Sequence, residues 1–155
     1  MPITISPERP DTPDARALIA ELQASLAPLY PKENQFGFSV EKLIRENVAF
    51  FVLRVDDAPA ACAGIQIVGS EYGEIKRMFV RPPYRGAGLG KRLLQHLEQY
   101  AAAQNIPLLR LETGTLQHAA IRLYEQYGFY RIPPFADYPE TPLNIYYEKK
   151  VGAQH

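Results

Sequence analysis

The segment Val80–Leu94 constrains the fold of this chain most, because it joins a predicted strand to a predicted helix through closely spaced glycines. It reads VRPPYRGAGLGKRLL and contains Gly86, Gly88 and Gly90. Glycine adopts backbone dihedrals that other residues avoid, so the N–H groups of such a loop can point into one concavity. The N-terminus of the following helix adds a partial positive charge. We therefore predict a phosphate-binding loop at the start of this helix.

Basic residues dominate the surroundings of this loop. No acidic residue lies between Ile75 and Leu97, whereas the same stretch contains Lys76, Arg77, Arg81, Arg85, Lys91 and Arg92. The whole chain has 17 basic and 17 acidic residues, so this concentration of positive charge is a local feature. A chain of net charge zero is not built to coat nucleic acid or an anionic membrane. We therefore expect a small anionic ligand, with no nucleic acid and no membrane as partner.

Two common phosphate-binding motifs do not fit the loop. A Walker A loop would need glycine and then Ser or Thr at the positions that Arg85 and Arg92 occupy. A Rossmann fingerprint would need its last glycine where Lys91 or Leu93 stands. From the residues alone, the remaining alternative to a ligand site is a tight connection between strand and helix.

The chain of 155 residues is 46% hydrophobic and 22% charged, which is typical of one globular domain, here residues 1–155. Hydrophobic periodicity and the positions of the prolines predict its elements. The predicted strands are Ile3–Ile5, Ala49–Val55, Ala60–Val68, Tyr72–Val80, Leu108–Thr113, Phe129–Arg131 and Asn144–Lys150. The predicted helices follow an N-cap at Asp14 or span Ser39–Asn47, Gly88–Gln104 and His118–Tyr127. This order favours an α/β fold, a mixed sheet with helices on its faces.

The cysteine count and the hydropathy exclude several classes of protein. One cysteine, Cys62, and three histidines cannot make an internal disulfide or a Cys/His zinc cluster. We predict Cys62 to be a small core residue. No apolar run approaches the roughly 20 residues of a membrane span, and the N-terminal residues do not resemble a secretory signal. We therefore expect a cytoplasmic protein without a metal site.

Three segments resemble the GNAT superfamily of N-acetyltransferases. Arg85-Gly-Ala-Gly-Leu-Gly90 is similar to its acetyl-CoA loop, Arg/Gln-x-x-Gly-x-Gly/Ala, and Glu74–Val80 is similar to its central strand. His118–Phe129 resembles its late helix, Asn-x-x-Ala-x-x-Leu-Tyr-x-x-x-Gly-Phe, although Gln117 stands where Asn is commonest. The resemblance covers nearly the whole chain. It implies one N-acetyltransferase domain whose central sheet has about six or seven strands, splayed in the middle, with about four helices on its faces.

The resemblance also implies acetyl-CoA as the cosubstrate. Backbone amides from Arg85 to Gly90 would hold its pyrophosphate. Main-chain groups of Met78 and Val80 would bind the pantetheine arm, where this strand splays from Leu108–Thr113. The basic side chains would either contact phosphate or form a solvated face. The complete set of predicted cofactor-binding residues is Met78, Phe79, Val80, Arg85, Gly86, Ala87, Gly88, Leu89, Gly90, Lys91 and Gln117.

Acetyl transfer to an amine requires that the ammonium lose a proton and that the departing thiolate be stabilised. By resemblance, Tyr124 is the catalytic acid, with its hydroxyl aimed at the thioester sulfur. A phenol with a pKa of about 10 is protonated at neutral pH and can donate to the thiolate. The alternative is an aromatic side chain of the helix core.

Glu74 is the catalytic base that the resemblance implies. The alternative is an ion pair of Glu74 with Lys76 or Arg77. Strand alternation predicts one face with Glu74, Lys76 and Met78, and an opposite face with Ile75, Arg77 and Phe79.

The function implied is acetyl-CoA-dependent transfer to a primary amine, a small molecule or a peptide, within a ternary complex. The alternative function is a non-catalytic module that binds acyl-CoA and regulates a partner. A homodimer is compatible with the sequence. In this fold the acceptor would lie between Tyr30–Phe38 and Pro133–Pro142, near Thr113 and Gly114.

Overall fold

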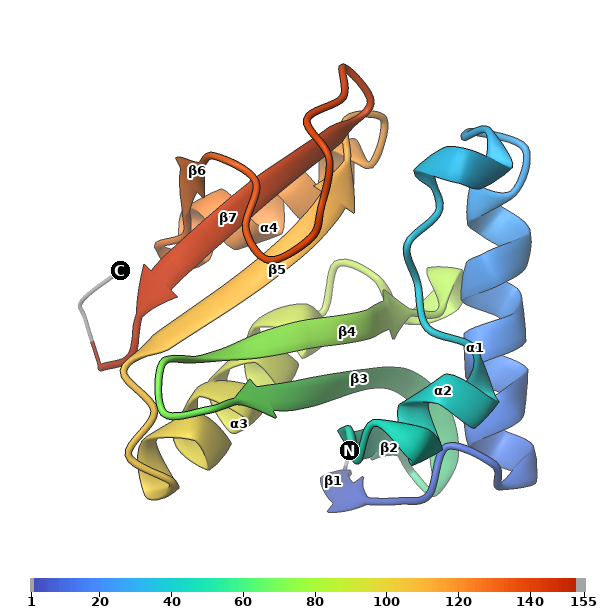
Figure 1. Ribbon diagram of the computed structural model, residues 1–155. Helices are drawn as coiled ribbons and strands as arrows, with labels where there is room; N and C mark the ends of the chain where they lie inside the picture. The colour runs from blue at the N-terminus through green and yellow to red at the C-terminus, as the bar shows by residue number, and fades with distance from the viewer. Residues whose placement is uncertain (1, 153–155) are drawn as a thin grey trace.

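A seven-stranded sheet with strand order β1-β2-β3-β4-β5-β7-β6 forms the centre of the computed structural model, which describes residues 2–152 (Figure 1). The strands are β1 (Ile3–Pro7), β2 (Ala49–Val55), β3 (Ala58–Val68), β4 (Tyr72–Val80), β5 (Leu108–Gly114), β6 (Tyr130–Ile132) and β7 (Asn144–Lys150). The helices are α1 (Pro13–Leu26), α2 (Val40–Arg45), α3 (Leu89–Ala103) and α4 (His118–Tyr127). The predicted α/β fold, the order of its elements and the strand count are confirmed.

The helices cover the sheet in two layers. Helices α3 and α4 bury their apolar sides on one face, behind the sheet in Figure 1, whereas α1 and α2 pack on the other. Cys62 belongs to the second layer and is 0% exposed, as predicted. Burial raises the pKa of its thiol to about 12, so the thiol is inert at neutral pH.

The N-cap of helix α1 lies two residues before the predicted one. Thr12 is the N-cap, and its side chain accepts a hydrogen bond from the Ala15 amide at 3.2 Å. Pro13 follows in the first turn, where its missing N–H and fixed φ cost nothing. The prediction of Asp14 as N-cap is therefore wrong. Asp14 lies in the first turn and accepts a hydrogen bond from Arg54 at 2.9 Å.

Strand β4 contains a bulge that changes which side chains share a face. Lys76 pairs with Gly64 and Phe79 pairs with Cys62, so Arg77 and Met78 together lie opposite one residue of β3. Arg77 has a φ of +51°, and such an extra residue reverses the alternation beyond it. Met78 therefore packs in the core beneath α3, as does Ile75, and Phe79 packs beneath α1. The predicted division of β4 into two faces is wrong from Arg77 onward.

Strands β4 and β5 separate after a short parallel contact. Only Gly73 and Glu74 of β4 pair with β5, opposite Leu109 and Arg110. The two strands then diverge toward the end of the sheet at which α3 and α4 begin (Figure 1). The predicted splay is confirmed, and it leaves one edge of β4 without a strand partner beyond Glu74.

Strand β6 begins one residue later than predicted. The amide of Phe129 donates to the Tyr124 carbonyl at 3.0 Å, which closes the end of α4 around the left-handed Gly128. Because that amide belongs to the helix end, pairing with β7 starts at Tyr130.

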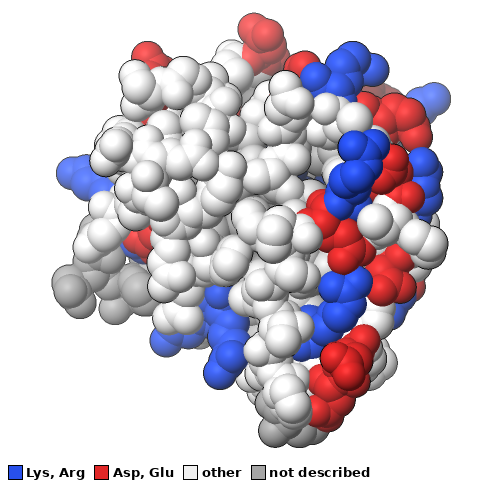
Figure 2. Space-filling view, turned by 90° about the horizontal axis from the view of Figure 1, so that it is seen from below, with Lys and Arg blue, Asp and Glu red and all other residues white. Residues whose placement is uncertain are grey.

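The charged surface is mixed in sign. On the face shown in Figure 2, acidic and basic residues lie interspersed along one side, and much of the remaining surface is uncharged. Such a face exerts little long-range attraction on a polyanion. No helix within residues 2–152 has the length and apolar character that a membrane crossing requires.

Candidate active site

The glycine loop connects β4 to α3 and places free amides at the helix start. Gly86 and Gly88 have φ values of +84° and +79°, which side chains other than glycine rarely adopt. Gly88 is the N-cap of α3, and no side chain caps this helix. The first-turn N–H groups therefore remain available for an anion, in the geometry that suits a phosphate.

A groove of about 970 Å³ runs along this loop between β4 and α4. All the predicted cofactor-binding residues line it except Ala87. The Arg85 side chain turns back toward the strand, where its Nε donates to the Val80 carbonyl at 2.9 Å. A groove of this volume is within the range of cofactor sites.

Gln117 and Tyr124 of the α4 region lie where this groove meets a second, smaller cavity. The Gln117 side-chain oxygen accepts hydrogen bonds from the Gly114 amide at 2.9 Å and the Thr113 hydroxyl at 3.3 Å. The residues that line both spaces are Leu22, Leu26, Met78, Gln117 and Tyr124. The two spaces are therefore adjacent, and they share the side chain predicted to be the acid.

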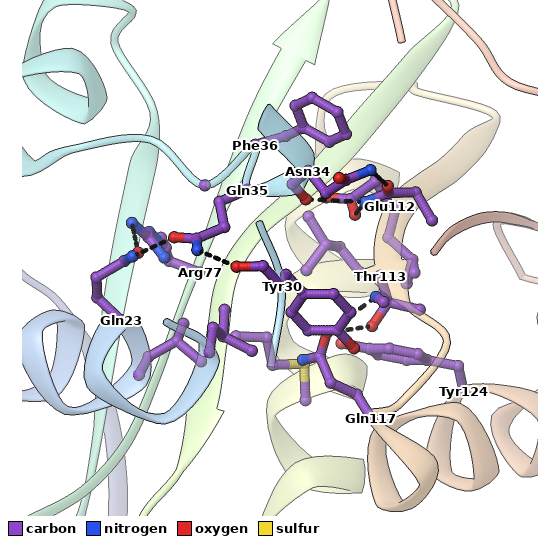
Figure 3. A pocket seen from close by; sticks show the side chains of 18 residues that line it. Gln23, Tyr30, Asn34, Gln35, Phe36, Arg77, Glu112, Thr113, Gln117 and Tyr124 are labelled. Carbon is purple, nitrogen blue, oxygen red and sulfur yellow. Dashed lines mark hydrogen bonds between the residues drawn. The ribbon is translucent and has the colours of Figure 1, made fainter. Parts of the chain in front are cut away.

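The Tyr124 side chain is buried against the rings of Phe129 and Tyr147. Figure 3 shows it beside Gln117 and Thr113 at the edge of the smaller cavity. The residue is 7% exposed and contacts the Phe129 ring at a centroid distance of 5.7 Å. Burial, and to a lesser extent the charge of Glu112, raises the pKa of Tyr124 above its ordinary value. Within residues 2–152 its hydroxyl has no hydrogen-bond partner. It is thus a protonated phenol that is free to donate.

The smaller cavity has a volume of about 90 Å³ and a polar lining. Figure 3 shows Arg77, Gln23 and Gln35 on one side of it, and Glu112 with Thr113 on the other. Tyr30 and Gly114 also line this cavity, as do Asn34 and Phe36. Thr113, Gly114 and part of the segment Tyr30–Phe38 therefore line one cavity, and their contact with the acceptor stays a prediction. The loop 133–142 contributes no lining residue within the described chain.

Glu112 on β5 is the ionisable residue that sequence reasoning missed. Burial raises the pKa of its carboxyl group, a hydrogen bond from Asn144 at 2.9 Å lowers it, and the charge of Glu74 adds to the rise, so that the pKa lies at about 7. A carboxyl group with this pKa can both accept and release a proton near neutral pH. One signal was visible: Glu112 is the acidic residue of a leucine-rich strand and directly precedes Thr113.

Glu74 lies outside both spaces, in a buried cluster with Lys76 and Tyr138. Its carboxylate accepts a hydrogen bond from Lys76 Nζ at 2.9 Å and another from the Tyr138 hydroxyl. Lys76 also lies 3.9 Å from the centroid of the Phe38 ring. Glu74 and Lys76 are 5% and 6% exposed, and neither lines the cavity or the groove. Glu74 and Lys76 therefore form a buried ion pair in which each side chain neutralises the charge of the other.

Comparison with known proteins identifies the family. The family described as Acetyltransferase (GNAT) matches residues 15–129. The chain belongs to the GNAT family. A curated IAA acetyltransferase from Azospirillum brasilense is 38% identical to this GNAT chain over 148 residues, which cover 95% of the chain and 97% of that protein. The chain is therefore an acetyltransferase, as the glycine loop and late helix indicated.

Solved structures agree with the GNAT fold. A candidate acyl-CoA N-acyltransferase from Klebsiella pneumoniae has 33% identity and a TM-score of 0.82, covering 96% of this chain and 97% of its own. A GNAT acetyltransferase from Elizabethkingia anophelis, solved with acetyl-CoA bound, has 20% identity and a TM-score of 0.71 over 96% of this chain and 97% of its own. The second likeness concerns the fold alone. Members of this family depend on acyl-CoA.

Proposed function

We propose that this GNAT protein transfers the acetyl group of acetyl-CoA directly to a primary amine held in the smaller cavity. The observation that carries the proposal is the junction at Tyr124, where the groove along the glycine loop meets a cavity that contains Glu112. Two reactants bound in adjoining spaces can react without a covalent enzyme intermediate, because the protein holds them together.

The residues of the groove fit an acyl-CoA. Acetyl-CoA supplies the acetyl group as a thioester. The amides of the loop Arg85–Gly90 and the uncapped start of α3 suit its pyrophosphate. The edge of β4 that lacks a strand partner beyond Glu74 leaves main-chain groups near Met78 for the amides of the pantetheine arm, whereas the Val80 carbonyl already accepts a hydrogen bond from Arg85. Because Arg85 already bonds the Val80 carbonyl, we propose that the loop amides hold the phosphates.

Glu112 and Tyr124 carry the proton steps in this proposal. Glu112 accepts a proton from the acceptor ammonium, and the free amine attacks the thioester carbonyl carbon. The carbon–sulfur bond then breaks while Tyr124 donates a hydrogen bond to the departing sulfur. The second proton of the attacking nitrogen passes to the thiolate, which gives the amide and free CoA. Its raised pKa keeps the proton on the phenol, so Tyr124 stabilises the thiolate without ionising first.

We propose that Glu112 is the catalytic base. The sequence prediction had assigned this role to Glu74. The lining of the acceptor cavity includes Glu112, and its pKa of about 7 is matched to the task. Glu74 is held by Lys76 and Tyr138 instead, and we propose that it neutralises Lys76.

Replacing Tyr124 with Phe is expected to lower kcat by about 10²-fold and to leave acetyl-CoA binding unchanged. The substitution removes a hydroxyl whose interaction strengthens only as the thiolate forms, and it keeps the ring packed against Phe129. Steady-state kinetics with varied acetyl-CoA test this. A raised KM for acetyl-CoA with an unchanged kcat would make Tyr124 a packing residue.

Acetyl-CoA is expected to raise the melting temperature of the protein. A ligand that binds only the native state adds about 2.7 kcal/mol at 100 times its Kd, which corresponds to about 5–10 °C for a domain of this size. Thermal melts with acetyl-CoA and with ATP measure the effect. Release of free CoA with a panel of amines then tests transfer itself. Stabilisation without turnover of any amine would instead support an acyl-CoA-binding module.

A further inference from the structure

Arg77 is a largely buried arginine without a carboxylate partner in the described part of the chain. Its Nε donates to the Phe38 carbonyl at 2.9 Å, and its Nη2 donates to the Gln23 side-chain oxygen at 3.0 Å. Both acceptors are neutral. Three other arginines, Arg54, Arg81 and Arg110, each pair with an acidic side chain. A guanidinium is seldom buried without an opposite charge.

The chain around Arg77 is shaped to hold its guanidinium at the wall of the cavity. A Cβ added to Gly37 would lie 2.4 Å from the guanidinium carbon, so the guanidinium occupies its present position because Gly37 has no side chain. Gln23 also donates to Gln35 at 2.7 Å, and Gln35 donates to the Tyr30 carbonyl at 2.8 Å. This chain of amides fixes the orientation of the Gln23 oxygen. The guanidinium is therefore held in place before any ligand binds.

The guanidinium retains donors that the protein does not use. Arginine has five N–H donors in a planar fork. Within residues 2–152, Nε and Nη2 of Arg77 have hydrogen-bond partners and Nη1 has none. A planar guanidinium matches a carboxylate, which it can bind through two parallel hydrogen bonds. Glu112, the charged residue on the other side of the cavity, is hydrogen-bonded to Asn144 and makes no ion pair with Arg77.

We propose that the acceptor is a small amine that also carries a carboxylate, which pairs with Arg77 while the amine faces Glu112. This inference deepens the proposed transfer to an amine and rests on it. The cavity of about 90 Å³ is small for a ligand site, which favours an amino acid over a peptide chain. Opposite charges at the two sides of one cavity would also orient such an acceptor.

The test compares matched acceptors in the full-length protein with acetyl-CoA. Each amino acid of a panel is assayed beside its carboxamide, which keeps the amine and side chain but has no negative charge. With the parent protein, kcat/KM for the best amino acid is expected to exceed that for its amide by at least about 100-fold, because loss of a partner leaves a buried donor unpaired. Equal turnover of both members would overturn the inference and leave acetyl transfer intact.

Two variants of the cavity test the role of Arg77 itself. Arg77→Gln removes the charge. It is expected to reduce the acid-to-amide ratio, which is kcat/KM for the amino acid divided by kcat/KM for its carboxamide, to near 1. Gln23→Glu keeps Arg77 and its packing but supplies an internal carboxylate at the Gln23 position. It is expected to lower kcat/KM for the acid by at least about tenfold more than for the amide. This second variant keeps the proposal testable if Arg77→Gln does not fold.

Arg81→Gln is the matched control. It removes the same charge from the residue that follows β4, where Arg81 pairs with Glu21 at 2.7 Å and lies outside both cavities. Its acid-to-amide ratio should equal that of the parent. An acid-to-amide ratio that is unchanged in both Arg77→Gln and Gln23→Glu would overturn the inference. Arg77 would then have only a structural role, through its hydrogen bond to the Phe38 carbonyl. Binding of acetyl-CoA without turnover of acids or amides would overturn the proposed function, and the inference with it.

Discussion

Replacing Glu112 with Gln is expected to lower kcat/KM for the amine acceptor by about 10²–10⁴-fold at neutral pH, the usual contribution of a general base. Glutamine keeps the size of the side chain and can still accept the hydrogen bond from Asn144. It cannot take a proton from the ammonium. Binding of acetyl-CoA should be unchanged, because Glu112 lines the smaller cavity and does not line the groove.

The pH dependence distinguishes a base from a residue that only shapes the cavity. Burial raises the pKa of Glu112 to about 7, so the carboxylate form is lost as the pH falls through that value. In the parent protein, kcat/KM should therefore decrease below about pH 7, by tenfold for each pH unit. This decrease appears as an inflection near pH 7 in the plot of kcat/KM against pH. Glu112→Gln should lose this inflection and keep any inflection that belongs to the acceptor amine. An inflection that persists in this variant would contradict the assignment.

Glu74→Gln is the comparison that separates the two carboxylates. If Glu74 is the base, as the sequence predicted, its variant should lose the inflection and Glu112→Gln should keep it. If Glu74 instead balances Lys76, the variant should lose stability and keep the inflection. Removing one partner of a buried ion pair costs about 3–5 kcal/mol, which chemical denaturation can measure.

Gly88→Val is expected to raise the Kd for acetyl-CoA by at least about 100-fold and to leave the protein folded. At a φ of +79°, a β-branched residue is strained, at a cost of about 1–3 kcal/mol. Gly88 lines the groove and no protein atom lies within 4 Å of an added Cβ, so a side chain at this position would occupy space along the groove. Isothermal titration calorimetry measures the affinity, and circular dichroism checks the fold.

Gly69→Val is the matched control for the glycine loop. Gly69 has a φ of +55°, has no atom within 4 Å of an added Cβ, and lies in the turn between β3 and β4. It should carry a similar strain and bind acetyl-CoA like the parent. Equal weakening by both substitutions would attribute the effect to strain, and parental affinity in Gly88→Val would remove the loop from the binding site.

Local sequence signals were sufficient wherever neighbours along the chain decide the structure. The glycine spacing before Leu89 predicted the loop and the start of α3, because positive φ and helix initiation depend on a few adjacent residues. Apolar periodicity predicted the buried stripe of α3 for the same reason. Errors by one or two residues arose at the ends of elements, where the choice among neighbouring hydrogen bonds sets the boundary, as at Phe129, whose amide donates to the carbonyl of Tyr124 at the end of α4.

Only the tertiary structure decided which charged side chains enter the active site. Alternation placed Arg77 on one face of β4, but the bulge opposite Ala63 turned it toward Gln23 and the cavity. Glu74, Lys76 and Tyr138 form one cluster although Tyr138 lies more than 60 residues away in sequence. The pKa of Glu112 depends on burial by segments far apart in the chain. The sequence by itself thus determined the elements, the glycine loop and the family, whereas charge, burial and partners at the site depend on long-range packing that no local pattern encodes.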